Sequence, residues 1–190
     1  MREIRFHGRG GQGTVIASHL LAVALFREGK QVQAFPAFGV ERRGAPVTAF
    51  LRVSDAPILL RCEIREPDDL VVLDPTLVTG TTVTAGLKPG GNILINSASP
   101  PERYADLLRL FKVATVDASA IAAQYGLGSR TQPIVNTAIL GAFAAWSGMV
   151  DLESICEAIR EEVHKRPDVN VAAAREAAAA LRRITEPLHV

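Results

Sequence analysis

Phe6-His7-Gly8-Arg9-Gly10-Gly11-Gln12-Gly13-Thr14 is the stretch of this sequence that decides its fold. Four of its residues are glycines, and it lies between a strand-like run, residues 4–6, and a long apolar run, residues 15–26. Glycine destabilises regular elements, so such a cluster marks backbone that turns sharply or that another group approaches closely. Where a strand, a glycine loop and a helix follow in that order, the unpaired N–H groups and the positive end of the helix dipole attract an anion. The stretch therefore predicts a phosphate or carboxylate site.

The spacing of Gly8, Gly10 and Gly13 fits the G-x-G-x-x-G pattern of dinucleotide-binding proteins. That pattern also expects a carboxylate at the end of the second strand, whereas residues 31–35 contain none, which disfavours ordinary NAD binding. Gln12 stands where a P-loop would have its lysine, so a P-loop is excluded as well. The alternative that the glycines only turn a tight corner stays open.

Bulk composition limits the class of protein. The 190 residues include 21 basic and 20 acidic side chains, with no basic run suited to nucleic acid. We expect one domain over residues 1–190, with an α/β core over about 1–117 and a helical part over about 118–190. The chain begins without an apolar signal segment and has no run of about 18 apolar residues, so we expect a cytoplasmic protein that does not enter a membrane. Its two cysteines and four histidines show no metal-ligand spacing, so no metal site is expected here.

Short apolar runs separated by turns predict a parallel sheet. Residues 70–73 are a continuous apolar run and residues 92–96 read Asn-Ile-Leu-Ile-Asn, and both suit buried strands. Asp74, Asn96 and Ser97 are then expected at the carboxyl edge of the sheet. Further strands are expected at 31–35, 47–53 and 111–116. We predict an α/β fold with a mostly parallel, doubly wound, Rossmann-like sheet.

The second half of the chain is rich in alanine and predicts an alanine-rich helical C-terminal part. Helices are expected over residues 118–125, 135–146, 152–163 and 169–184. Small side chains in residues 136–144 allow another helix, or a partner subunit, to approach closely, and we favour packing within the chain.

A basic segment is the second candidate for binding. Arg42, Arg43 and Gly44 belong to a loop that follows the second strand, so this loop and the glycine loop are expected at the same edge of the sheet. Arg9, Arg42 and Arg43 can then converge on an anion, because a guanidinium holds phosphate or carboxylate through two hydrogen bonds. An ion pair with Glu41 is the alternative for these arginines.

Three motifs together resemble a known family. The segments 8–13, 38–46 and 136–141, supported by 92–97 and 170–174, are similar to the gamma subunit of the 2-oxoacid:ferredoxin oxidoreductases over nearly the whole chain. The resemblance implies a complex that oxidatively decarboxylates a 2-oxoacid, passes electrons through iron–sulfur clusters to ferredoxin and releases an acyl-coenzyme A. It also implies alpha, beta and delta partners that hold thiamine diphosphate, magnesium and the 4Fe-4S clusters.

The resemblance implies a non-catalytic role for this chain, in assembly and in contacting the phosphates of coenzyme A, with no cofactor held tightly by the chain alone. The residues expected to make that contact are Gly8, Arg9, Gly10, Gly11, Gln12, Gly13, Thr14, Arg42, Arg43, Gly44, Asn96, Ser97 and Asn136. Phe38 stands where some members of the family have tyrosine, so a hydroxyl contact is not carried over.

Other functions stay open on the sequence. The chain could be the small subunit of an indolepyruvate ferredoxin oxidoreductase, a purely structural subunit, or a free-standing nucleotide-binding protein. A homodimer of the isolated chain through the alanine-rich helices is also left open.

Overall fold

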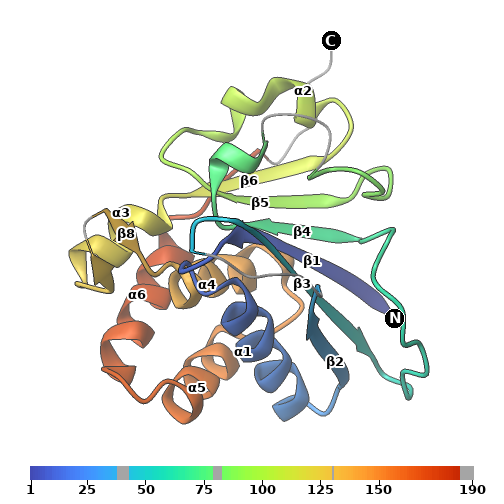
Figure 1. The fold of residues 1–190 in the computed structure, drawn as a ribbon, viewed down its shortest axis with the longest axis horizontal. Coiled ribbons are helices and arrows are strands. Elements are labelled where there is room, and N and C mark those ends of the chain that lie inside the picture. The colour runs from blue at the N-terminus through green and yellow to red at the C-terminus, as the bar shows by residue number, and fades with distance from the viewer. Residues whose placement is uncertain (38–42, 79–82, 130, 185–190) are drawn as a thin grey trace.

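The computed structural model describes residues 1–37, 43–78, 83–129 and 131–184, and these residues form one large sheet with helices packed on it (Figure 1). Seven strands lie in the order β2-β3-β1-β4-β5-β6-β9. Their bounds are β1 Arg2–Arg9, β2 Gln31–Pro36, β3 Pro46–Ser54, β4 Asp69–Val72, β5 Asn92–Asn96, β6 Lys112–Val116 and β9 Arg182–Arg183.

Five of these seven strands run in the same direction, which confirms the predicted fold class. β1, β4, β5 and β6 pair in parallel. β3 is antiparallel to both β1 and β2, so β2 runs parallel to β1 without touching it. An inserted strand, β3, therefore separates the two strands that the sequence predicts on either side of the first helix. The ends of β1 and β2 nevertheless lie at the same edge of the sheet, as expected.

The helices follow the predicted segments closely. Their bounds are α1 Thr14–Arg27, α2 Ala105–Leu108, α3 Ala118–Gln124, α4 Asn136–Ser147, α5 Leu152–Glu162 and α6 Pro167–Ala179, with 3-10 turns η1 at Pro75–Val78 and η2 at Pro101–Tyr104. A short hairpin joins β7 Gly128–Ser129 to β8 Gln132–Pro133. The last helix differs from its prediction, because it ends at Ala179 and the chain then pairs with β6 as β9.

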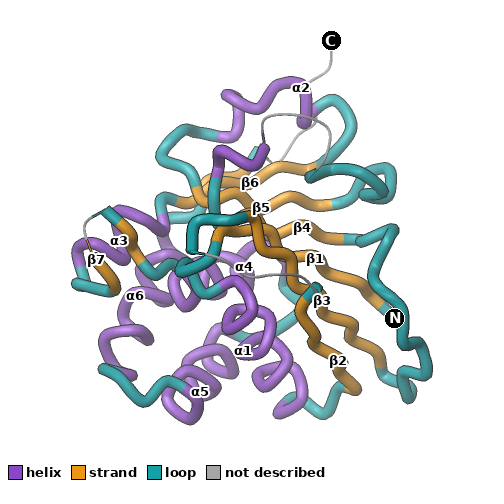
Figure 2. Tube along the Cα trace, viewed as in Figure 1, coloured by secondary structure: helices purple, strands orange, loops and turns teal. Residues whose placement is uncertain are grey.

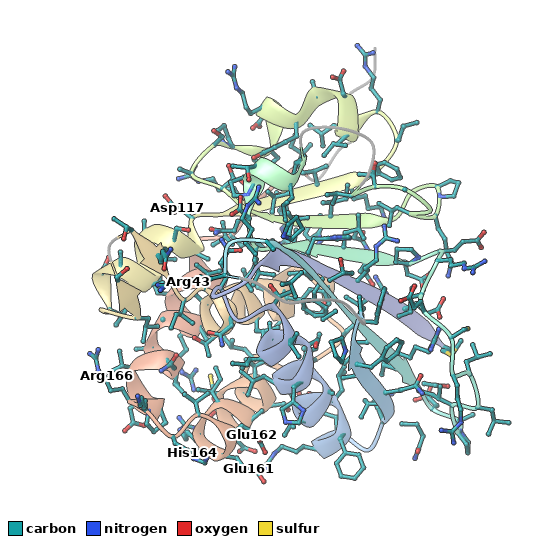
Figure 3. The ribbon with its side chains drawn as sticks, in the orientation of Figure 1. Arg43, Asp117, Glu161, Glu162, His164 and Arg166 are labelled. Carbon is teal, nitrogen blue, oxygen red and sulfur yellow. The ribbon has the colours of Figure 1, made fainter. Side chains whose placement is uncertain are left out.

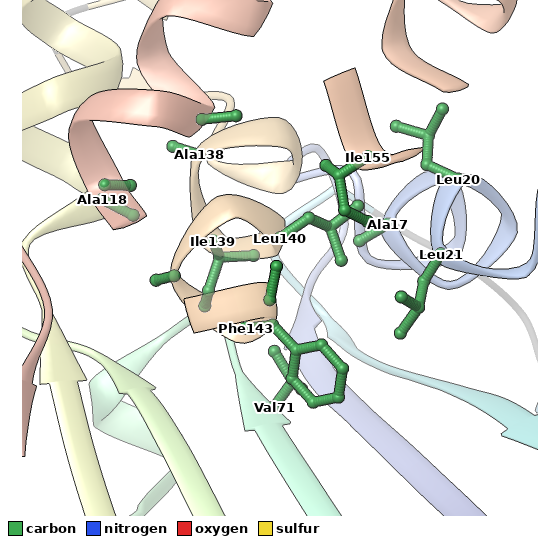
Figure 4. Close-up of a cluster of buried hydrophobic side chains, with 14 of the residues drawn as sticks. Ala17, Leu20, Leu21, Val71, Ala118, Ala138, Ile139, Leu140, Phe143 and Ile155 are labelled. Carbon is green, nitrogen blue, oxygen red and sulfur yellow. The ribbon is translucent and has the colours of Figure 1, made fainter. Parts of the chain in front are cut away.

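Both faces of the sheet are covered, but unequally (Figure 2). α1, α4, α5 and α6 cover one face, where Phe6 and Val71 pack against Leu21, Ile139 and Phe143. Figure 4 shows this core, in which side chains of α1, α4 and α5 meet over the sheet. Because side chains alternate along a strand, the neighbouring residues face the other way and pack against η2 and α2. No helix in the described ranges is long and apolar enough to cross a membrane.

The closest helix pair is α4 and α6, which meet at Gly141. A Cβ atom at this position would lie well inside van der Waals contact of the Ala174 carbonyl oxygen. The small residues that the sequence shows in 136–144 thus admit a helix of the same chain.

We expect Gly141→Ala to destabilise the protein by about 1–3 kcal/mol, because overpacking of α4 against α6 outweighs the gain in helix propensity. Urea unfolding followed by circular dichroism measures this free energy. Ala145→Val is the matched control, since it adds bulk to the same helix at an exposed position. It should change the stability by less than about 1 kcal/mol. Equal effects of the two substitutions would contradict the packing argument.

Candidate functional site

The glycine loop joins β1 to α1 through backbone that leaves no room for side chains. Gly11 and Gly13 have φ angles of 101° and 84°, in the left-handed region that favours glycine. A Cβ at Gly13 would lie 2.8 Å from Asn136 Nδ2, and one at Gly8 would overlap the Thr14 hydroxyl oxygen. Gly8 and Gly13 are therefore required by close packing, and Gly11 by backbone conformation.

The side chain of Gln12 folds back into the loop. Its Oε1 accepts a hydrogen bond of 2.8 Å from the backbone N–H of Arg9, while the backbone N–H of Gln12 donates to the Arg9 carbonyl at 3.1 Å. Its Nε2 reaches across to β4 and donates to Asp74 Oδ2 at 3.0 Å. Gln12 thus closes the loop and ties it to the end of the neighbouring strand.

Arg9 is also held by the protein. Its Nε lies 3.3 Å from Asp74 Oδ2, its Nη2 donates to Thr76 Oγ1 at 2.9 Å, and its Nη1 donates to the Gly44 carbonyl at 3.2 Å. Asp74 Oδ1 in turn accepts from the N–H and the hydroxyl of Thr76, at 3.0 and 2.6 Å. Every nitrogen of the Arg9 guanidinium therefore has a partner within this network.

The pKa of Asp74 is lowered by these contacts. Burial alone raises it, but the hydrogen bonds from Thr76 and Gln12, together with the charge of Arg9, outweigh that effect. Asp74 is consequently a carboxylate at neutral pH, and it lies beside Arg9 at the carboxyl edge of the sheet.

The basic segment lies directly against the glycine loop. Gly10 N–H donates to the Ala45 carbonyl at 2.9 Å, and Gly44 N–H donates to the Gly10 carbonyl at 3.0 Å. Arg43 is exposed and donates to Gln132 on β8. Figure 3 shows Arg43 on the same side of the molecule as Asp117, which follows β6. Arg42, the third arginine of the predicted cluster, lies outside the described residues.

Three depressions surround the loop. The most enclosed, about 290 Å³, has Asp74, Asn96 and Ser119 in its wall. A second, of about 500 Å³, lies between Gly11, Arg43 and the β7–β8 hairpin. The third, of about 300 Å³, is apolar and is lined by Val15, Ile16, Val47 and Ile134 beside the start of α1. A ligand larger than a single phosphate can therefore contact the loop from several sides.

Of the three predicted polar residues outside the two loops, only Asn96 lines one of these depressions. Asn96 lines the first depression, but its amide is used structurally, since Nδ2 donates to the Leu73 carbonyl at 2.8 Å and to Ser119 Oγ at 2.9 Å. Ser97 points elsewhere and accepts from the Tyr104 hydroxyl at 2.9 Å. Asn136 is 5% exposed and packs against Gly13, so its role at the loop is packing.

Sequence reasoning missed three members of the site: Asp74, Thr76 and Gln132. Asp74 had a usable signal, because it follows a buried strand at the carboxyl edge. The other two had none, since Thr76 belongs to a 3-10 turn and Gln132 to a two-residue strand, and only the folded chain places them here.

The loop still has capacity for an anion. Within the described ranges, the N–H groups of Gly11 and Gly13 have no protein acceptor, and α1, 14 residues long, begins at the next residue, Thr14. The Thr14 hydroxyl oxygen is buried and lacks a partner in the same part of the chain. Such groups at a helix N-terminus favour a negatively charged oxygen.

His7, next to the loop, is not arranged as a base for this site. Its Nε2 accepts a hydrogen bond of 2.9 Å from Arg5 Nε, and Arg5 also donates to the carbonyls of Val83 and Ala85. Burial, and then the charge of Arg5, lower the pKa of His7 to about 4. His7 is therefore neutral at pH 7 and helps to anchor the segment at residues 83–85.

Comparison with known proteins assigns the chain to an oxidoreductase family. The family model described as "Pyruvate ferredoxin/flavodoxin oxidoreductase" matches residues 3–180, so the chain belongs to that family. It is 56% identical, over 85% of its length and 86% of the relative's, to the "Pyruvate/ketoisovalerate oxidoreductases common subunit gamma" of Thermococcus kodakarensis. The chain is thus a gamma-type subunit of a pyruvate or ketoacid ferredoxin oxidoreductase.

Solved structures agree with this assignment. The pyruvate oxidoreductase subunit PORC of Thermotoga maritima superposes with a TM-score of 0.83 at 36% identity, covering 97% of this chain and 98% of that one. The same fold occurs in a 2-oxoglutarate:ferredoxin oxidoreductase from Magnetococcus marinus, with a TM-score of 0.72 at 19% identity over 98% of this chain and 33% of that one.

We expect Thr14→Val to stabilise the isolated chain by about 1 kcal/mol, because it removes a buried hydroxyl that lacks a partner in the described structure. Thr137→Val is the matched control. The Thr137 hydroxyl is also buried but donates to Asn170 Oδ1 at 2.9 Å, so its loss should destabilise by about 1 kcal/mol or more. Chemical denaturation of both variants measures whether each substitution raises or lowers the free energy of unfolding. Destabilisation by Thr14→Val would show that its hydroxyl is satisfied.

Stability should fall in acid through His7. Its pKa in the folded chain, about 4, lies below the ordinary 6.5, so between these values the unfolded chain binds the extra proton. The resulting loss is on the order of 2–3 kcal/mol as the pH drops from 6.5 to 4. Urea titrations across this pH range should show that the free energy of unfolding falls less steeply with decreasing pH in His7→Gln. An unchanged slope in His7→Gln would contradict this assignment.

Proposed function

We propose that this chain is the non-catalytic gamma subunit that holds the phosphates of coenzyme A in a 2-oxoacid:ferredoxin oxidoreductase, and that it assists assembly of the complex. The observation that carries the proposal is the pair of N–H groups without protein acceptors at Gly11 and Gly13, at the start of α1 and beside Arg43, among the described residues.

The chemistry of these groups suits a phosphate. Backbone N–H groups at a helix start supply donors and a positive partial charge, and Arg43 adds a full positive charge at the rim. The apolar depression at Val15, Ile16 and Ile134 offers contact area for the rest of a large ligand. A structural neighbour, the Magnetococcus marinus enzyme, was solved with coenzyme A and succinyl-CoA bound.

The proposed role is positioning rather than proton transfer. Asp74 has acceptor positions on both oxygens occupied by Thr76, Gln12 and Arg9, and neutral His7 is bound to Arg5. Neither group is poised to take a proton from a substrate. Holding the phosphate end of coenzyme A restricts the thiol arm and raises its effective concentration at a reaction centre in a partner subunit.

The partners follow from membership of the family. Alpha, beta and delta subunits would supply thiamine diphosphate, magnesium and the 4Fe-4S clusters, and electrons would leave to ferredoxin through the complex. A pyruvate or ketoisovalerate enzyme is favoured over the indolepyruvate enzyme that the sequence left open, because the relative from Thermococcus kodakarensis carries the former name at 56% identity.

Arg43→Ala tests the phosphate site in the assembled enzyme. We expect the dissociation constant of coenzyme A to rise about tenfold, since one charge-assisted contact to phosphate is lost. Isothermal titration of the complex measures it. Arg109→Ala, at an exposed arginine after α2, is the matched control and should leave the affinity unchanged.

Co-purification of the partner subunits separates binding from assembly in the same experiment. A normal complex with unchanged coenzyme A affinity in Arg43→Ala would remove the proposed contact. Loss of the partners, with normal affinity in whatever complex still forms, would favour a purely structural loop instead.

A further inference from the structure

We propose that Asp74 sets the anion affinity of the glycine loop by competing with the ligand for Arg9, while it holds Gln12 inside the loop. This inference rests on the proposed phosphate site and adds a residue that determines how strongly that site binds. It concerns the cluster of Arg9, Gln12, Asp74 and Thr76 described above.

The first step is the state of Arg9. A guanidinium beside a phosphate site normally offers its fork to the ligand. Here Nε faces Asp74 Oδ2 at 3.3 Å, Nη2 faces Thr76 Oγ1 at 2.9 Å, and Nη1 faces the Gly44 carbonyl at 3.2 Å. A phosphate that uses this fork must therefore displace a carboxylate that already occupies it.

The second step is the place of Gln12. Its Oε1 accepts the Arg9 N–H at 2.8 Å and lies 3.2 Å from the position of a Cβ on Gly8, inside the curl of the loop. An amide oxygen held by a loop N–H is the neutral counterpart of a phosphate oxygen. Asp74 stabilises this arrangement, because its Oδ2 accepts from Gln12 Nε2 at 3.0 Å.

The third step is the Thr14 hydroxyl. Its oxygen is buried, has no partner among the described residues, and overlaps the same space above Gly8. Gln12 Oε1 also lies near the position of a Cβ on Gly8, but it does not hydrogen-bond to Thr14, so the closed arrangement leaves the Thr14 hydroxyl unused.

These three observations give Asp74 one consistent role. Its charge neutralises Arg9, and its Oδ2 holds Gln12 inward. The carboxylate is already engaged by the protein, since it accepts three hydrogen bonds from Thr76 and Gln12 and forms an ion pair with Arg9. Asp74 is therefore a positioning residue that acts through Arg9 and Gln12.

Asp74→Asn tests the inference on the full-length chain, with inorganic pyrophosphate and coenzyme A as probes in isothermal titration. The substitution keeps the shape and the oxygen that Thr76 contacts, but removes the charge. We expect the dissociation constant for pyrophosphate to fall about tenfold. Asp117→Asn is the matched control: Asp117 follows β6 at the same edge and caps α3 through Ala120 N–H, which asparagine can also do. The affinity of the Asp117→Asn variant for pyrophosphate should equal that of the wild-type chain.

Arg9→Ala in both backgrounds decides whether the gain passes through Arg9. If it does, Asp74→Asn should no longer increase affinity when Arg9 is absent, which a general loss of negative charge would not explain. Circular dichroism verifies the fold, and Asp74→Ser serves as the second variant if Asp74→Asn does not fold.

The outcomes separate this inference from the function on which it rests. Pyrophosphate binding by the wild-type chain, with unchanged or weaker binding by the folded Asp74 variants, overturns the role of Asp74 alone. A gain that persists without Arg9 overturns it as well. Failure of the wild-type chain, the assembled enzyme and all variants to bind either probe overturns the phosphate site itself, and this inference with it.

Discussion

The structure depends on one constraint, which is that β1 must turn into α1 within the few residues from Gly8 to Gly13. The turn has no space for side chains at its two ends, because Thr14 packs over Gly8 and Asn136 packs under Gly13. Two other segments are then built on it: residues 44 and 45 bond to the backbone of Gly10, and Asp74 receives Gln12. The loop is thus both the start of the main helix and the centre of the carboxyl edge.

The direction of the strands explains why polar groups gather at that edge. β1, β4, β5 and β6 are parallel, so the polar residues at or just past their carboxyl ends come to the same edge: Arg9, Asp74, Asn96 and Asp117. Asn96 shows how this is stabilised, since its buried amide joins the end of β4 to the start of α3. The inserted strand β3 does not disturb the edge, because β2 keeps the direction of β1.

Much of the fold could be predicted from local pattern. The run at residues 92–96 gave the bounds of β5 correctly, and the glycine spacing placed a loop before a helix, because both depend on neighbouring residues. The pairing partners could not be predicted in the same way. Nothing local indicates that β3 lies between β1 and β2, or that residues 182–183 leave the helical pattern to pair with β6. Arg9 illustrates the limit for the site. An arginine at this position can pair with a ligand or with a carboxylate of the same chain, and only the fold shows that Asp74, 65 residues away, is its partner.

A carboxylate beside a proposed phosphate site is understandable from the reaction of the family. Coenzyme A and its acyl product carry the same phosphates, so a site that recognises those phosphates binds substrate and product alike. Every increase in affinity there slows product release, because differences in affinity within one site are expressed mainly in the dissociation rate. Release is often the slow step of an enzyme cycle. In the proposed site, an internal carboxylate that takes back Arg9 when the ligand leaves would keep the affinity moderate, and it would also keep this partly exposed guanidinium paired in the empty loop. On this proposal, the ion pair between Arg9 and Asp74 would serve turnover by stabilising the ligand-free state against which the phosphates compete.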